Sequence, residues 1–151
     1  MHKLTLVGVM VLAGCMSSGA VPPGQATADI GSEIATIAIS QHGAPYRYGG
    51  SAPTGFDCSG LVMFSHDVVG IPVPRTAREQ HRAAKPVPKG HQRAGDLVFF
   101  RTSGRGVSHV GVLVESGRFV HAPSSGKHVV ISRLDEKYWR DRVIGYGRFY
   151  Q

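Results

Sequence analysis

The chain has 151 residues, of which 42% are hydrophobic and 18% are charged, and this composition excludes a disordered or fibrous protein and fits one globular domain. Seventeen Lys and Arg residues outnumber ten Asp and Glu, and the formal charge of +7 suits an anionic partner such as a lipid surface or an acidic polymer. The basic residues are scattered and lack aromatic interleaving, so we expect no nucleic-acid binding.

The N-terminal segment predicts export. Lys3 precedes an apolar stretch, Leu4–Ala13, which is roughly half of the ~20 residues that span a bilayer and is typical of a signal peptide. The stretch ends in Leu-Ala-Gly-Cys15, which resembles the lipobox of bacterial lipoproteins. We therefore predict a lipoprotein signal peptide over residues 1–14 and lipidation of Cys15. An ordinary secretory signal with a chance cysteine is the alternative.

The next segment predicts a tether and then a helix. Residues 15–28 are rich in Ser, Gly, Pro and Ala and are expected to form a lipid-anchored flexible tether. The folded domain is expected to cover residues 29–151. Apolar residues recur at helical spacing from Asp29 until Gly43, which predicts the first helix of the domain.

The rest of the chain predicts helices first and strands later. A Gly/Pro/Ser loop precedes a second helix over 58–70, and a short polar helix over 75–84 leads into a Pro-Lys-Gly loop. Short β-rich runs follow at 96–100, 108–115, 118–122, 128–132 and 143–150, with a helical turn within 134–142. This order predicts an α+β fold in which N-terminal helices pack on a central antiparallel sheet of about five to six strands.

Cys58, at the predicted start of the second helix, is the candidate nucleophile. Unpaired N–H groups and the positive end of the helix dipole favour the thiolate, so we expect a lowered thiol pKa. The same N–H groups can stabilise an oxyanion. Asp57 would oppose the pKa shift. Lipidation of Cys15 would leave Cys58 without a disulfide partner, whereas a Cys15–Cys58 disulfide stays open if the lipobox is not used.

Two histidines on predicted strands are the candidate partners of this thiol. His109 and His121 are 12 residues apart, which fits a hairpin that places their rings side by side. His109 could then act as general base, and His121 could fix its tautomer. A zinc site made by these two residues and Cys58 is the alternative, although the chain has no close ligand pair. Five further histidines are expected to be surface or satisfied core residues: His42, His66, His81, His91 and His128.

Four motifs in this order, FDCSGLV, GDLVFF, SHVGVLV and FVHAPSSG, resemble the NlpC-type cysteine peptidases of bacterial cell walls, here in a lipoprotein member. The resemblance runs from about Ile34 to Phe149 and implies a papain-like NlpC fold with no cofactor and no catalytic metal. It implies that Cys58 is the nucleophile, His109 the base and His121 the residue that orients the base.

The same resemblance implies substrate contacts. Tyr48 in YRYGG is expected to assist at the oxyanion and the substrate carbonyl. The neighbours of the nucleophile and of the base, namely Asp57, Ser59 and Ser108, are expected to line substrate subsites. The PRTAREQ segment is similar to a segment beside the groove in the family, which makes Arg75 and Gln80 further candidate contacts.

The resemblance implies hydrolysis of amide bonds in peptidoglycan stem peptides through an acyl-thioester. The bond is the D-γ-glutamyl–diamino acid bond or the D-Ala–diaminopimelate cross-link. We expect a monomer in the cell envelope, lipid-anchored through Cys15 in the outer membrane and facing the periplasm, because Met16 is not the Asp that retains lipoproteins in the inner membrane. A regulatory adaptor or protease is a further expected partner, although no residue identifies one.

Two other functional hypotheses use the same residues. A non-catalytic peptidoglycan-binding or scaffold lipoprotein would keep the fold without the chemistry. An acyltransferase or amidase acting on another secreted substrate would form the same acyl-thioester and differ only in the acceptor.

Overall fold

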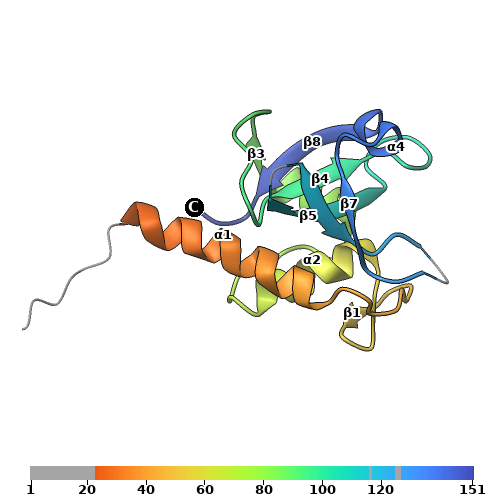
Figure 1. Ribbon diagram of the computed structural model, residues 1–151, viewed down its shortest axis with the longest axis horizontal. Coiled ribbons are helices and arrows are strands. Elements are labelled where there is room, and N and C mark those ends of the chain that lie inside the picture. Colours follow the sequence, from red (N-terminus) through yellow and green to blue (C-terminus); the bar gives the residue numbers. More distant parts are fainter. Residues whose placement is uncertain (1–22, 116, 125–126) are drawn as a thin grey trace, which may run out of the picture.

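The computed structural model describes residues 23–115, 117–124 and 127–151, with side chains from Ile30 onward. The predicted signal peptide and Cys15 lie outside these residues, as do residues 15–22 of the predicted tether. Helices α1 and α2 lie together on one side of a six-stranded antiparallel sheet, which is the α+β arrangement expected from the sequence (Figure 1).

Four helices are present in the described residues: α1 (Pro23–Ser40), α2 (Cys58–Asp67), α3 (Ala77–Ala83) and α4 (Lys137–Arg140). Helix α1 begins at Pro23 instead of Asp29, so residues 23–28, which were assigned to the tether, are helical. Proline is well tolerated in the first turn of a helix, which accounts for this earlier start. None of the described helices combines the length and the apolar character needed to cross a bilayer.

The main sheet has the strand order β3-β8-β4-β5-β6-β7. Its strands are β3 (Lys85–Val87), β4 (Leu97–Phe100), β5 (His109–Glu115), β6 (Arg118–His121), β7 (Val130–Arg133) and β8 (Val143–Arg148). A separate two-stranded hairpin pairs β1 (Ser51–Ala52) with β2 (Gly55–Phe56). Strand β3, which contains Pro86, was not predicted; it lies between the predicted polar helix and the Pro-Lys-Gly loop. The structure places it at the sheet edge, where a missing N–H is tolerated.

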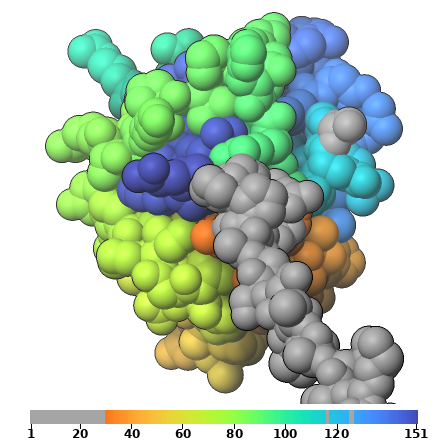
Figure 2. Space-filling model, turned by 90° about the vertical axis from the view of Figure 1, so that its left-hand side faces the viewer, coloured from red at the N-terminus to blue at the C-terminus, as the bar shows by residue number. Residues whose placement is uncertain are grey.

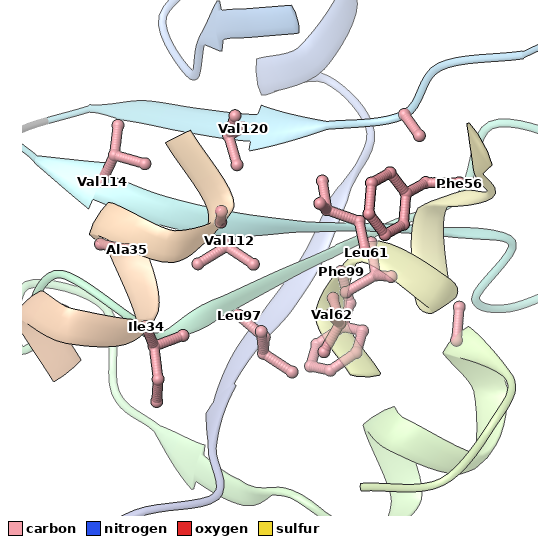
Figure 3. Packing of buried hydrophobic residues seen from close by; sticks show 14 of the residues in the cluster. Ile34, Ala35, Phe56, Leu61, Val62, Leu97, Phe99, Val112, Val114 and Val120 are labelled. Carbon is pink, nitrogen blue, oxygen red and sulfur yellow. The ribbon is translucent and has the colours of Figure 1, made fainter. Parts of the chain in front are cut away.

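The main core lies between the helices and one face of the sheet. Ile34 from α1 and Leu61 from α2 point toward Leu97, Phe99 and strand β5 (Figure 3). Alternate residues of the same strands, such as Val98 and Phe100, form a smaller cluster with Phe119 and Trp139 on the opposite face. Because side chains alternate along a strand, those of β5 and β6 also divide between the two faces of the sheet.

Strand β8 lies between β3 and β4, so the C-terminal region completes the sheet. In Figure 2 the dark blue C-terminal segment lies between the yellow-green helical layer and the green strand region. The Tyr150 hydroxyl donates to Ala94 O (2.7 Å) and contacts Asp96 Oδ1 (3.1 Å). Arg148 forms an ion pair with the fully buried Asp96. The C-terminus is therefore fastened to the turn that opens β4.

Candidate active site

Cys58 is a free, half-buried thiol at the first position of α2. The carboxylate of Asp57 caps this helix by accepting from Gly60 N (2.7 Å). The sulfur faces strand β5, where the Val110 N–H approaches it together with the N–H groups of Ser59 and Cys58 itself. These three donors favour the thiolate, and N–H groups at a helix start can also stabilise an oxyanion.

A close approach of the chain fixes the first turn of α2. A Cβ at Gly60 would overlap Gly50 O, so only glycine fits there. The loop is held by two further bonds, from Gly49 N to Asp57 Oδ2 (3.0 Å) and from Asp57 N to Gly50 O (3.0 Å). The glycine of the DCSG motif therefore lets the loop lie directly against the turn that carries Cys58.

A chain of hydrogen-bonding side chains crosses strands β5, β6 and β7. His109 Nε2 lies 2.9 Å from His121 Nδ1, and His121 Nε2 lies 3.0 Å from Ser132 Oγ. Trp139 covers both rings, stacked on His109 (5.5 Å between centroids, 26° between planes) and edge-on to His121 (4.7 Å). His109 directly precedes Val110, whose backbone N–H approaches the Cys58 sulfur, so the chain begins on the strand that borders the thiol.

The bond between the two histidines limits the positions of their protons. If His109 Nε2–H donates to His121 Nδ1, then His121 Nε2–H donates to Ser132, and His109 Nδ1 is free to accept a proton. If His121 Nδ1–H donated to His109 Nε2 instead, the ring proton of neutral His109 would lie on its own Nδ1, which could then not accept one. Among the described residues no three His, Cys, Asp or Glu side chains converge as metal ligands, and these two rings bind each other instead.

The electrostatics of Cys58 differ from the expectation of a lowered pKa. Burial raises the pKa of the Cys58 thiol, Asp57 raises it further, and the three backbone N–H groups only partly oppose these effects. The prediction of a lowered pKa was therefore wrong for the protein without substrate, because desolvation outweighs the helix start.

Burial lowers the pKa values of the two histidines, which is opposite to its effect on the Cys58 thiol. It lowers the pKa of His109 to about 4. Burial and the neighbouring His109 lower the pKa of His121 to about 3. At neutral pH the site thus holds a neutral thiol and two neutral imidazoles instead of a preformed ion pair.

A cavity of about 650 Å³ lies beside Cys58 and is lined by Asp57, Ser59, Arg75 and Ser108, among others. Arg75 Nη2 donates to Asp57 Oδ2 (2.6 Å) and Arg75 Nη1 donates to Ser59 Oγ (2.9 Å). The structure therefore brings the acid, the hydroxyl and the guanidinium of the predicted subsites together at one wall.

Gln80 does not reach this cavity, so its prediction as a substrate contact is wrong. It is fully buried, and its Nε2 donates to Ser59 O (3.0 Å) and Pro74 O (2.8 Å). Gln80 lies on the inner face of α3, where these two carbonyls need donors, and its side chain is therefore turned away from the cavity where it was predicted. Gln80 therefore fastens α3 to the first turn of α2.

The predicted tyrosine, Tyr48, lines the cavity but is 89% exposed. Tyr46, two residues earlier, lines the same cavity and packs against the core. Its pKa is raised by burial and by the adjacent Cys58 and Asp57. The sequence analysis chose Tyr48 and missed Tyr46, although both stand in YRYGG; the bridge between Tyr46 and Phe56 ties Tyr46 to the segment before Cys58.

Ser108 also has a structural task. Its Oγ accepts from Thr102 N (2.8 Å) and Ser103 N (3.0 Å) and lies 3.1 Å from Thr102 Oγ1. This hydroxyl therefore holds the loop after β4 against the start of β5. Ser132 and Trp139 were missed as site residues, because no spacing in the sequence links either of them to the histidines.

The model of the NlpC/P60 family matches residues 43–148, which is more than half of the chain. The murein DD-endopeptidase MepH of Escherichia coli (strain K12) is 49% identical over 115 residues, which cover 73% of this chain and 42% of that protein. The chain thus spans less than half the length of this relative. The probable endopeptidase NlpC of the same strain is 39% identical over 142 residues, covering 91% of this chain and 92% of that protein.

A solved structure has the same fold. The crystal structure of an NlpC/P60 family protein from Bacillus cereus ATCC 10987 matches with a TM-score of 0.75 and 30% identity. The match covers 80% of this chain and 40% of that chain.

Proposed function

Because the chain belongs to the NlpC/P60 family, we propose that it is a cysteine peptidase that hydrolyses amide bonds in peptidoglycan stem peptides. One observation carries this proposal: the Cys58 thiol lies beside the strand that presents His109, and His109 is hydrogen-bonded to His121. The name of MepH, a murein DD-endopeptidase, supports this substrate class, and the name of NlpC, a probable endopeptidase, supports the type of reaction.

The chemistry starts from neutral groups. As the sulfur of Cys58 attacks the scissile carbonyl, its proton moves to His109 Nδ1, while His109 Nε2–H remains bonded to His121. The N–H groups at the start of α2 stabilise the oxyanion. The imidazolium then gives its proton to the departing amine, and an acyl-thioester remains on Cys58.

Water completes the cycle. His109 takes a proton from the attacking water, the C–S bond of the acyl-thioester breaks, and the thiol regains its proton as the acid leaves. His121 and Ser132 keep the ring of His109 in one orientation throughout. We assign oxyanion assistance to Tyr46 in preference to Tyr48, because Tyr46 lies inward beside Cys58. Tyr46→Phe is accordingly expected to lower kcat more than Tyr48→Phe.

The test is digestion of purified sacculi by the full chain, with released fragments identified by mass. The wild-type protein is expected to release stem-peptide products, and Cys58→Ala is expected to release none while keeping its circular dichroism spectrum. The fragment masses identify either the D-γ-glutamyl–diamino acid bond or the D-Ala–diaminopimelate cross-link as the bond that is cut.

Three other outcomes would contradict the proposal. Equal release by both proteins would remove Cys58 from the mechanism. Binding of sacculi without release would identify a scaffold. Acylated products formed only with an added amine acceptor would identify a transferase.

The location is part of the same proposal. We propose that the protein works in the cell envelope as a monomer, held in the outer membrane through a lipid on Cys15, as the Leu-Ala-Gly-Cys motif predicts. The anchor would keep the peptidase near its polymeric substrate and so raise its effective concentration. Radiolabelled palmitate should enter the wild-type protein in a bacterial host and should not enter Cys15→Ser; equal labelling of both would overturn the anchor.

A further inference from the structure

The indole of Trp139 covers the imidazole of His109 and is itself held by other aromatic rings. It stacks on His109 with 5.5 Å between the ring centroids and 26° between the planes. Phe100 (4.9 Å) and Phe119 (5.2 Å), both fully buried, hold the indole from the sheet. Tyr138 meets it nearly at a right angle (4.9 Å, 87°). The indole therefore presents its π face to His109 in a fixed arrangement.

The proposed reaction places a positive charge on this imidazole. His109 takes the proton of the Cys58 thiol during acylation and a proton of water during hydrolysis. Burial opposes that charge, since His109 is 5% exposed and its pKa is lowered to about 4. The imidazolium is thus an unfavourable species in both halves of the cycle. This step rests on the proposed function.

The partner of His109 supplies no negative charge. In a Ser-His-Asp triad the buried Asp stabilises the imidazolium. Here the partner is His121, and burial together with His109 lowers its pKa to about 3, so it is neutral at neutral pH. Among the described residues, no Asp or Glu carboxylate lies within ion-pair distance of His109.

The charged groups around His109 occur with both signs on each side. Glu136 and Lys127 line the cavity that His109 also lines, so their fields oppose each other. On the side of the thiol, Asp57 forms an ion pair with Arg75 (2.6 Å). Neither side therefore offers an unopposed negative charge for the imidazolium.

The π face of an indole attracts a cation within about 6 Å of the ring centroid, and it does so more strongly where water is excluded. We propose that Trp139 is a positioning residue whose indole stabilises the imidazolium of His109 during catalysis, a task that a carboxylate performs in other triads. A neutral imidazole gains much less from this contact. The effect therefore acts on the charged state that forms during the reaction and raises kcat.

The test uses the fact that Trp139 is the only tryptophan of the chain. The full chain, made in a tryptophan auxotroph on mono-, di- or trifluorotryptophan, carries fluorine at this residue alone. Fluorine withdraws electrons from the π face and hardly changes the shape of the ring. With a soluble cross-linked muropeptide that contains both candidate bonds, kcat should fall about two- to threefold per fluorine atom at unchanged KM. Trp139→Phe made in the same media is the control, because it contains no tryptophan and its kcat should not depend on the medium.

Two substitutions separate the π face from simple covering of the ring. Trp139→Phe keeps an aromatic face and should lower kcat by about threefold, whereas Trp139→Leu keeps only apolar bulk and should lower it by about thirtyfold. A kcat that does not respond to fluorination, or equal losses in the two variants, would overturn this role of Trp139 and leave the proposed function intact. The fluorinated proteins give their answer even if Leu packs poorly. A wild type that cuts neither the muropeptide nor sacculi would instead overturn the proposed function.

Discussion

Cys58 and His109 are both neutral at rest because each is withdrawn from water. Burial raises the pKa of the thiol and lowers the pKa of the imidazole, so the two effects together disfavour the charged pair. A proton must therefore move while the substrate is being attacked. The N–H groups around the sulfur act mainly on the charge that develops during the reaction.

This protonation state predicts how Cys58 reacts with iodoacetamide. The alkylation rate should rise continuously as the pH increases from 6 to 10, because the thiolate is scarce at neutral pH. Asp57→Asn keeps an oxygen that can cap α2 and removes the charge that raises the thiol pKa, so its profile should shift to lower pH. A rate plateau between pH 5 and 8 in the wild type would indicate a preformed thiolate–imidazolium pair and contradict the neutral state.

The sequence was sufficient for placements that depend on local spacing. A cysteine before a helical pattern and two histidines 12 residues apart in strand-like runs predict a thiol at a helix start and two adjacent rings, and the structure has both. Ser132, Trp139 and the inward orientation of Tyr46 depend on contacts between distant segments, and no local pattern encodes them. The pKa of Cys58 was mispredicted for the same reason, since burial is a tertiary property.

Helices α2 and α3 are joined through the side chain of Gln80. Its amide supplies donors to Ser59 O, in the first turn of α2, and to Pro74 O, in the segment that leads to Arg75. The position of the wall formed by Ser59 and Arg75 therefore depends on a residue that is buried outside the cavity.

Gln80→Met should lower the free energy of unfolding by about 1–3 kcal/mol, because it fills the space but leaves two carbonyls without their donor. It should also raise KM, since Arg75 loses its fixed position. Urea denaturation and steady-state kinetics measure the two effects. Gln41→Met is the control, because the Gln41 bond to Ser40 is exposed, and it should change stability by less than about 0.5 kcal/mol. Equal stability of the two variants would show that the Gln80 bonds contribute little.

The elements with strong periodicity were predictable. The two long helices and strands β4 to β8 follow regular apolar patterns, and helices packed on one face of an antiparallel sheet were expected. Strands β1 and β2 have two residues each, and β3 contains Pro86, so none of the three carries a usable pattern. They form because neighbouring segments supply their partners.

Three buried histidines make the whole molecule sensitive to acid. Burial lowers the pKa of His66 to about 4, and its Nε2 has no partner among the described residues. His109 and His121 are similarly lowered, to about 4 and about 3. The unfolded chain therefore binds more protons than the folded chain between pH 6.5 and these values, so stability is greatest above pH 6.5 and is lost as the pH falls.

The free energy of unfolding should decrease by up to ~4 kcal/mol per pH unit near pH 5, which corresponds to three protons. His66→Asn retains a donor for Val62 O and removes one titrating group, so it should reduce this slope by ~1.4 kcal/mol per pH unit. Denaturant titrations at pH 7, 6 and 5 measure the slopes. A slope that is identical in the two proteins would mean that His66 is not charged on unfolding.

The position of β8 inside the sheet affects when the enzyme can become active. All the residues of the proposed mechanism precede Val143, yet β4 has no neighbour on one side until β8 has been added. Because a chain is made from its N-terminus, the sheet stays incomplete until residues 143–148 have been added. We therefore expect a chain that ends before β8 to hold all of these residues and still to lack a stable site.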